Sequence, residues 1–207
     1  MHPTNRLFWE RCQKKYSKYF KDPSKVVEFG SGYINGTIRD YFECADYIGV
    51  DWREAKHVDL ISLAHEVPFE AESFDTVASA SMLEHDPHWM KSLNKMVGVM
   101  KQDGIFVISW GAGLNGVHGF NEAPDGRFHA LRAGYVIDLL EILGLYIHEF
   151  QYERTLLLEK NVPEIAGRIG LARTPLGMGE AVLVAFKDEG FAIGEKIIEP
   201  LWDIDKP

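Results

Sequence analysis

Short apolar segments with the character of β-strands alternate along this chain with segments that have helical periodicity. Strands are expected at residues 25–29, 47–50, 57–61, 74–79, 104–109, 146–152 and 181–186, and helices at residues 5–21, 36–43, 86–100 and 131–143. Such alternation predicts an α/β fold, a doubly wound and largely parallel sheet with helices on both faces. Because no linker-like stretch or internal repeat divides the 207 residues, we expect a single domain over residues 1–207.

The expected site lies where these strands end. In open α/β sheets, ligands bind beyond the carboxyl ends of the strands, near the point where the strand order reverses. The functional residues should therefore follow Phe29, Val50, Ser79 and Ser109.

A glycine-rich turn follows the first of these strands, where residues 28–36 read Glu-Phe-Gly-Ser-Gly-Tyr-Ile-Asn-Gly. A dinucleotide-binding turn would need a third glycine at position 35, which is Asn35 here. The carboxylate of Glu28 would also repel a pyrophosphate at the following helix N-terminus. S-adenosylmethionine has no phosphate and carries a sulfonium and an ammonium group, so the turn favours this cofactor over a dinucleotide.

Asp51 ends the second strand, 21 residues after Gly30. An acidic side chain at this place typically accepts hydrogen bonds from the ribose hydroxyls of a nucleoside ligand. Trp52 follows it and either covers one face of the adenine or packs on the protein.

In their order along the chain, several motifs resemble those of class I S-adenosylmethionine-dependent methyltransferases, and most closely the small "type 11" group. The similarity covers roughly residues 24–150, and its motifs are Val26-Val27-Glu28-Phe29-Gly30-Ser31-Gly32, Gly49-Val50-Asp51, Val67-Pro68-Phe69, Ser73-Phe74-Asp75 and Leu83-Glu84-His85. The resemblance implies a Rossmann-like sheet of seven strands with the last strand antiparallel, and S-adenosylmethionine as the cofactor.

The resemblance also implies roles for individual residues. Glu28 and the turn Gly30-Ser31-Gly32 would hold the methionine moiety, and Asp51 would hold the ribose. Main-chain groups of Ser79 or Ala80 would face the ligand's amino group, and the segment 83–85 would line the mouth of the site.

Two features depart from the family's pattern. The loop after Gly32 is longer than the usual Gly-x-Gly-x-Gly. Relatives also carry an Asp that contacts the adenine amino group, where this chain has Leu63. The adenine contact is then expected from backbone groups near Leu63 and Ala64, or from Asp59.

Three histidines are candidates for a general base. His85 follows the fourth strand, although it also suits a structural role in that turn. His118 and His129 lie in the loop 110–130, whose length favours an acceptor-binding role over a surface connection. The insertion 154–179 is interpreted as an acceptor-side lid or as a homodimer contact. No metal is expected, because Asp86 and Pro87 between His85 and His88 are better explained as the start of a helix.

Composition limits the classes of partner. The formal net charge is −9, which argues against a nucleic-acid partner. No apolar run reaches the roughly 18–20 residues of a membrane span, and the N-terminus lacks a signal peptide's apolar region, so we expect a cytoplasmic protein. Cys12 and Cys44 form no metal-binding or disulfide pattern.

The sequence therefore predicts methyl transfer from S-adenosylmethionine to a small-molecule or glycan acceptor. Two alternatives stay open: a nicotinamide- or nucleotide-sugar-dependent enzyme on the same fold, and a non-catalytic S-adenosylmethionine-binding protein.

Overall fold

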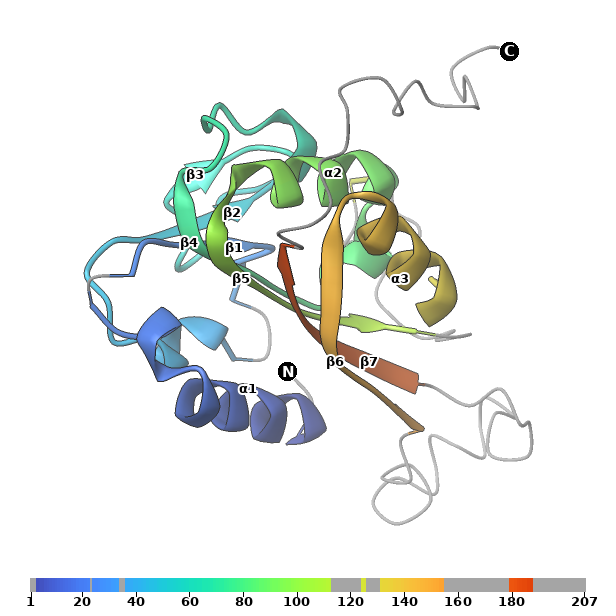
Figure 1. The fold of residues 1–207 in the computed structure, drawn as a ribbon. Coiled ribbons are helices and arrows are strands. Elements are labelled where there is room, and N and C mark those ends of the chain that lie inside the picture. Colours follow the sequence, from blue (N-terminus) through green and yellow to red (C-terminus); the bar gives the residue numbers. More distant parts are fainter. Residues whose placement is uncertain are drawn as a thin grey trace, which may run out of the picture.

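The computed structural model describes residues 3–22, 24–33, 36–112, 124–125, 131–154 and 179–187 (Figure 1). Within these residues, a seven-stranded sheet has the order β3-β2-β1-β4-β5-β7-β6. The strands are β1 Val26–Phe29, β2 Tyr47–Asp51, β3 Leu60–Ile61, β4 Phe74–Ala80, β5 Met100–Gly111, β6 Leu145–Arg154 and β7 Gly179–Lys187. The helices are α1 Pro3–Lys15, α2 Trp89–Val99 and α3 Ala133–Ile142, with short 3-10 turns η1 Ser17–Tyr19, η2 Ile38–Tyr41, η3 Ala64–Glu66 and η4 Leu83–His85.

The strand directions confirm the predicted fold class. Strands β3, β2, β1, β4 and β5 run parallel to one another, whereas β7 is antiparallel to both β5 and β6. The chain runs outward from β1 to β3 and then returns to place β4 on the other side of β1. The strand order therefore reverses between β1 and β4, which is where a ligand site is expected.

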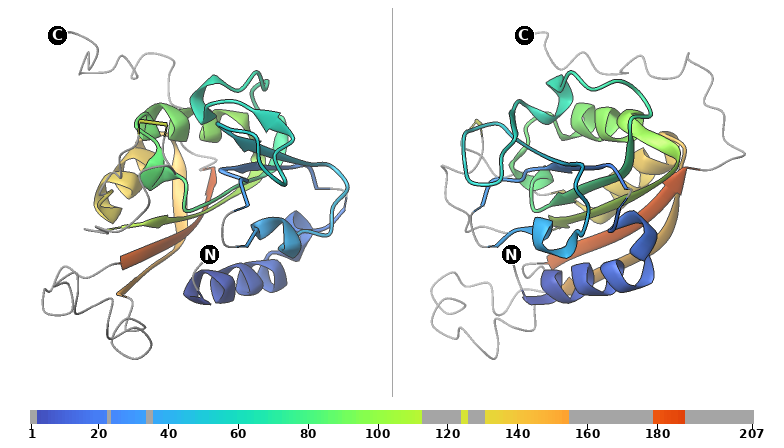
Figure 2. Two further views of the ribbon diagram at one scale, coloured as in Figure 1. Left: turned by 180° about the vertical axis from the view of Figure 1, so that it is seen from behind. Right: turned by 90° about the vertical axis from the view of Figure 1, so that its left-hand side faces the viewer.

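Helices cover both faces of the sheet (Figures 1 and 2). On one face, α1 buries Phe8, Trp9 and Cys12 in a cluster with Ile105 and Val107 of β5. On the other face, α2 and α3 form the larger core cluster, which includes Leu93, Leu140, Phe106 and Ile108. Alternate residues of β5 point to opposite faces, so this strand contributes to both cores.

Side-chain bonds to the strand β6 fasten α1 to the sheet. Arg11 donates to Gln151 at 3.1 Å and to Glu149 at 3.3 Å. Lys15 and Tyr16 also donate to the Glu149 carboxylate, which is 19% exposed. One acidic side chain thus receives three donors from the N-terminal helix and its end.

The N-terminal helix is shorter than the predicted 5–21, since α1 ends at Lys15 and the 3-10 turn η1 follows. The main-chain oxygen of Tyr19 accepts hydrogen bonds from Thr76 Oγ1 at 2.8 Å and from Ser24 Oγ at 3.0 Å. The main-chain oxygen of Phe20 accepts from the N–H of Glu43 at 2.7 Å. These carbonyls lie in the last four residues of the predicted helix, where no helical N–H reaches them, so other parts of the chain satisfy them.

Three further elements are shorter than expected. The predicted helix 36–43 is only the 3-10 turn η2, and the predicted strand 57–61 is only β3. Helix α2 begins at Trp89 instead of Asp86, and a turn precedes it in which Asp86 Oδ1 accepts a hydrogen bond from His88 N–H at 2.7 Å.

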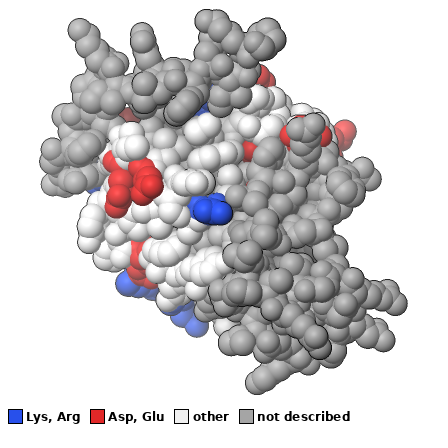
Figure 3. All heavy atoms as spheres, turned by 90° about the vertical axis from the view of Figure 1, so that its right-hand side faces the viewer, with Lys and Arg blue, Asp and Glu red and all other residues white. Residues whose placement is uncertain are grey.

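Figure 3 shows the side of the molecule that carries α3, where uncharged atoms fill much of the described surface between scattered charged groups. In the part of the chain that the structure describes, no helix combines the length and apolar character that crossing a membrane requires.

Candidate active site

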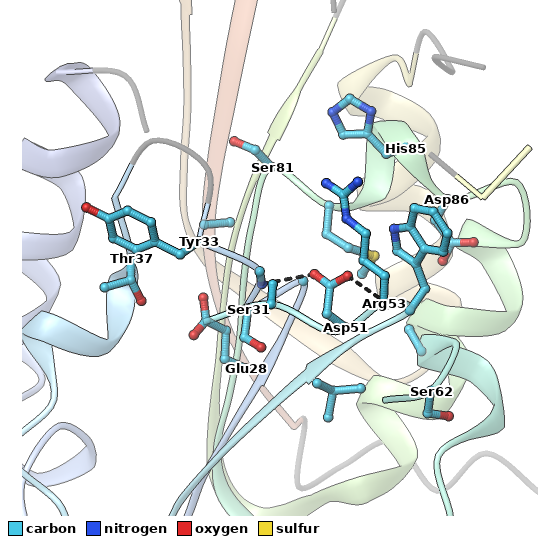
Figure 4. Close-up of a pocket in the computed structure, with 18 of the residues that line it drawn as sticks. Glu28, Ser31, Tyr33, Thr37, Asp51, Arg53, Ser62, Ser81, His85 and Asp86 are labelled. Atoms are coloured by element: carbon cyan, nitrogen blue, oxygen red, sulfur yellow. Dashed lines mark hydrogen bonds between the residues drawn. The ribbon is translucent and has the colours of Figure 1, made fainter. Parts of the chain in front are cut away.

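A cavity of about 400 Å³ lies at the carboxyl ends of β1, β2 and β4 (Figure 4). Its volume is in the range of small-molecule sites. The segments that line it are 30–33 and 36–38 after β1, 51–55 after β2, 62–64 after β3 and 80–82 with 85–86 after β4. The position agrees with the expectation from strand order.

The glycine-rich turn is held against its neighbours at both glycines. Gly30 has a φ of +82°, and a Cβ there would lie 2.5 Å from Met82 Cβ. A Cβ on Gly32 would lie 2.7 Å from Asp51 Oδ2. Both positions need glycine because the backbone passes closer to its neighbours than any side chain allows.

Asp51 lies at the centre of the labelled residues in Figure 4. Its Oδ2 accepts a hydrogen bond from Gly32 N–H at 2.9 Å, and Oδ1 accepts one from Arg53 N–H at 3.3 Å. A carboxylate oxygen has more than one acceptor site, so this side chain can also receive donors from a ligand. The Asp51 carboxylate thus links the turn after β1 to the segment after β2.

Glu28 lines the cavity but is almost inaccessible, with 3% exposure. Its Oε2 accepts a hydrogen bond from the Tyr47 hydroxyl at 2.7 Å. Burial raises the pKa of Glu28 to about 8, opposed by the Tyr47 bond and by Arg39 and reinforced by the charges of Asp51 and Asp59. Without a ligand, this carboxyl group is therefore mostly protonated at pH 7.

The end of β4 distinguishes the two residues that the sequence left as alternatives. Ala80 lines the cavity, as do Ser81 and Met82. The Ser79 side chain is fully buried, and the cavity lining does not include it. Within the register, Ser79 pairs with Phe29 of β1 and Ile108 of β5, so its main chain lies inside the sheet.

The segment after β3 brings Ser62, Leu63 and Ala64 to the cavity. The lining does not include Asp59, the alternative adenine contact. Its Oδ2 accepts hydrogen bonds from Gly49 N–H at 2.7 Å and from Arg39 Nη1 at 3.0 Å. Asp59 therefore stabilises the segment after β2, and its carboxylate is not part of the cavity lining.

Of the three candidate bases, His85 lines the cavity at the end of η4 (Figure 4). His118 and His129 lie outside the described residues. Of the loop 110–130, only residues 110–112 and 124–125 are described, and Pro124 reaches the cavity lining. The insertion 154–179 is described only at its two ends, so its lid and dimer roles stay predictions.

His88 lies against another histidine, His65. The rings of His88 and His65 are 4.7 Å apart between centroids. Among the residues with described positions, no group of three His, Cys, Asp or Glu side chains has a geometry that could hold a metal ion.

Sequence reasoning missed several lining residues, among them Thr37, Arg53, Met82 and Asp86. Arg53 is two residues after Asp51 and places its guanidinium 5.3 Å from the Trp52 ring centroid. The positions of Arg53 and Met82 just after strand ends could have identified them. Asp86 was interpreted only as a helix cap, and no sequence signal distinguishes that role from one in a cavity.

Comparison with known families identifies the kind of domain. Residues 27–108 match the model of a family described as a methyltransferase domain. No curated protein sequence matches the chain significantly.

Solved structures share the fold at low sequence identity. YcgJ from Bacillus subtilis is 14% identical with a TM-score of 0.63, over 89% of this chain and 100% of that one. The 1,6-didemethyltoxoflavin-N1-methyltransferase of Burkholderia thailandensis, solved with S-adenosylhomocysteine, is 18% identical with a TM-score of 0.58, over 87% and 77%. The phosphoethanolamine N-methyltransferase 2 of Haemonchus contortus, also with S-adenosylhomocysteine, is 17% identical with a TM-score of 0.58, over 87% and 53%.

The family match covers β1, β2 and β4 together with the turns that form the cavity, and the fold agrees with it over the rest of the sheet. Residues 27–108 therefore match a methyltransferase domain, and the solved structures share its fold over most of the chain.

Proposed function

We propose that this enzyme transfers the methyl group of S-adenosylmethionine to a small-molecule or glycan acceptor at the cavity described above. The observation that carries the proposal is the placement of Asp51, which lies in the cavity between the glycine-rich turn and the segment after β3 (Figure 4).

The order of chemical groups along the cavity fits the order of groups in the cofactor. Glu28 and the turn 30–32 lie on one side of Asp51 and suit the amino-acid part, whose positive charge would favour the ionised form of the Glu28 carboxyl. The Asp51 carboxylate suits the two ribose hydroxyls. On the other side, Trp52 and the segment 62–64 offer aromatic, apolar and backbone surfaces that suit the flat adenine. When bound, the cofactor supplies an electrophilic methyl group on a sulfonium.

The charge of the chain supports a small acceptor over a nucleic acid. The chain carries a net charge of −9, which does not attract nucleic acid. Much of the catalysis in such a displacement is positioning of the two reactants. For a hydroxyl acceptor, His85 is placed at the cavity to take the proton.

Calorimetric titration with S-adenosylmethionine, S-adenosylhomocysteine and NAD tests the cofactor part of the proposal. We expect micromolar binding of the first two ligands and a loss of at least about tenfold in Asp51→Asn, because each ribose bond to a charged group stabilises binding by about 1.5–3 kcal/mol. Glu54→Gln is the matched control, since Glu54 also lines the cavity but is exposed. Binding of NAD alone would overturn the proposal.

Release of S-adenosylhomocysteine in the presence of candidate acceptors tests the transfer step. An acceptor that is turned over by the wild type should lose activity in His85→Ala only if its methylated atom must lose a proton, and the loss should shrink as pH rises. Tight cofactor binding with no turnover on any small-molecule or glycan acceptor would favour the non-catalytic binding protein.

A further inference from the structure

Asp86 is a buried acidic residue at the cavity to which the proposed cofactor contacts assign no role. The residue follows η4 directly, is 7% exposed and lines the cavity. Its Oδ1 accepts the hydrogen bond from His88 N–H at 2.7 Å. Its Oδ2 is buried and has no hydrogen-bond partner among the described residues. A buried acceptor without a donor costs free energy, so a donor from a bound molecule would stabilise this geometry.

The position of Asp86 indicates which part of the ligand it would meet. Among the described residues that line the cavity, two contain a buried polar side-chain atom without a partner, Ser31 and Asp86. Ser31 belongs to the glycine-rich turn. Asp86 lies on the opposite side of Asp51, the side of Ser62 (Figure 4).

Packing between two segments fixes Asp86 on that side. Helix α2, which begins three residues after Asp86, packs against η3, and the rings of His65 and His88 are 4.7 Å apart across this contact. The turn that contains Asp86 is therefore held next to the segment 62–64, the side of the cavity that suits the adenine.

Adenine presents an exocyclic amine, a hydrogen-bond donor that a buried site must satisfy. The side chain of Leu63 has no acceptor, and the carboxylate of Asp59 is bonded to Gly49 and Arg39 instead. Among the described side chains that line this side of the cavity, Asp86 Oδ2 is the buried acceptor without a partner.

We propose that Asp86 Oδ2 accepts a hydrogen bond from the exocyclic amine of the adenine ring and thereby selects adenosyl over inosyl ligands. The inference rests on the proposed function, because it requires the adenine to lie on this side of Asp51. A site built around a buried hydrogen-bonding group discriminates strongly, since a ligand without the matching group leaves it unpaired. Inosine has a carbonyl oxygen in place of the amine and would face the carboxylate as a second acceptor.

The test compares the affinities of S-adenosylhomocysteine and its inosine analogue for the full-length wild type and for Asp86→Asn. In the variant, the amide oxygen can still accept from His88 N–H, so the amide NH2 takes the place of Oδ2 and becomes a donor. We expect the wild type to prefer the adenosyl ligand and Asp86→Asn to lose about 10- to 100-fold in affinity for it. The same variant should gain affinity for the inosyl ligand.

Both affinities are measured on the same protein, and partial unfolding of the variant would lower both equally. A change in their ratio therefore cannot come from partial unfolding. Glu141→Gln removes the same charge from an exposed position on α3, outside the cavity lining, and should leave the ratio unchanged. An equal loss for both ligands in Asp86→Asn, or no change in either, would overturn the inference while the cofactor assignment stands. Failure of the wild type to bind S-adenosylhomocysteine would overturn both.

Discussion

Replacement of Glu28 by Gln should change how the stability of this protein depends on pH. Glu28 is 3% exposed, and its pKa is raised from 4.5 to about 8, chiefly because burial disfavours the ionised form. Between these two values, the folded protein holds a proton that the unfolded chain has released. Because the folded state binds more protons there, its stability must fall as pH rises.

The size of this loss of stability follows from the pH range between the two pKa values of Glu28. Each pH unit inside it removes about 1.4 kcal/mol from the free energy of unfolding. From pH 5 to pH 7, this group alone therefore removes about 2–3 kcal/mol, a large share of the 5–15 kcal/mol typical of a domain. The amide oxygen of Gln can still accept the hydrogen bond from the Tyr47 hydroxyl, and Gln does not titrate.

The assay is urea unfolding of the ligand-free wild type and of Glu28→Gln at pH 5, 6, 7 and 8. The histidines and the exposed acids titrate equally in both proteins, so they cancel in the difference. The variant should become more stable relative to the wild type by about 2–3 kcal/mol between pH 5 and pH 7. A difference that stays constant across this range would refute the reasoning, and Glu54→Gln should show no such trend.

Three further substitutions test single contacts. Gly30→Ala should lower the free energy of unfolding by about 1–3 kcal/mol in urea titrations and weaken cofactor binding, because the backbone is left-handed there and a Cβ would lie 2.5 Å from Met82 Cβ. Thr76→Val should lower the free energy of unfolding by about 1–2 kcal/mol in the same assay, since it removes the buried donor to the main-chain oxygen of Tyr19 at 2.8 Å. Glu149→Ala should lower the free energy of unfolding by about 1 kcal/mol, a small value because the Arg11 and Lys15 side chains that bond Glu149 are partly exposed. The same variant should raise the rate of amide hydrogen exchange across α1. An unchanged rate would show that apolar packing alone holds this helix.

Much of the fold could be predicted from local patterns. The strands β1, β2, β4, β5, β6 and β7 were expected close to their observed places, because a buried strand produces a short apolar run or an alternation that is visible in the residues themselves. The position of the site could be predicted from the same strand pattern, because ligands of such sheets bind beyond the carboxyl ends of the strands. The residues Gly30, Gly32 and Asp51 could be recognised because a close backbone approach and a strand-end carboxylate each require particular residue types.

Other features depend on contacts between segments far apart in the chain, and no local pattern encodes them. Beyond Lys15 the chain forms the 3-10 turn η1, and Thr76, 57 residues after Tyr19, donates a hydrogen bond to the main-chain oxygen of Tyr19. The pKa of Glu28 is raised by burial in the sheet and lowered in part by the hydrogen bond from the Tyr47 hydroxyl, a residue of the neighbouring strand β2.

Asp86 shows the difference most clearly. The sequence alone determined that an acid precedes a proline at the start of a helical segment, which suits a helix cap. Only the tertiary structure decided that helix α2 starts later and that one carboxylate oxygen stays buried and unpartnered beside the cavity. The physical reason is that propensity acts over a few neighbouring residues, whereas burial and hydrogen-bond satisfaction are settled by whichever segments the fold brings into contact.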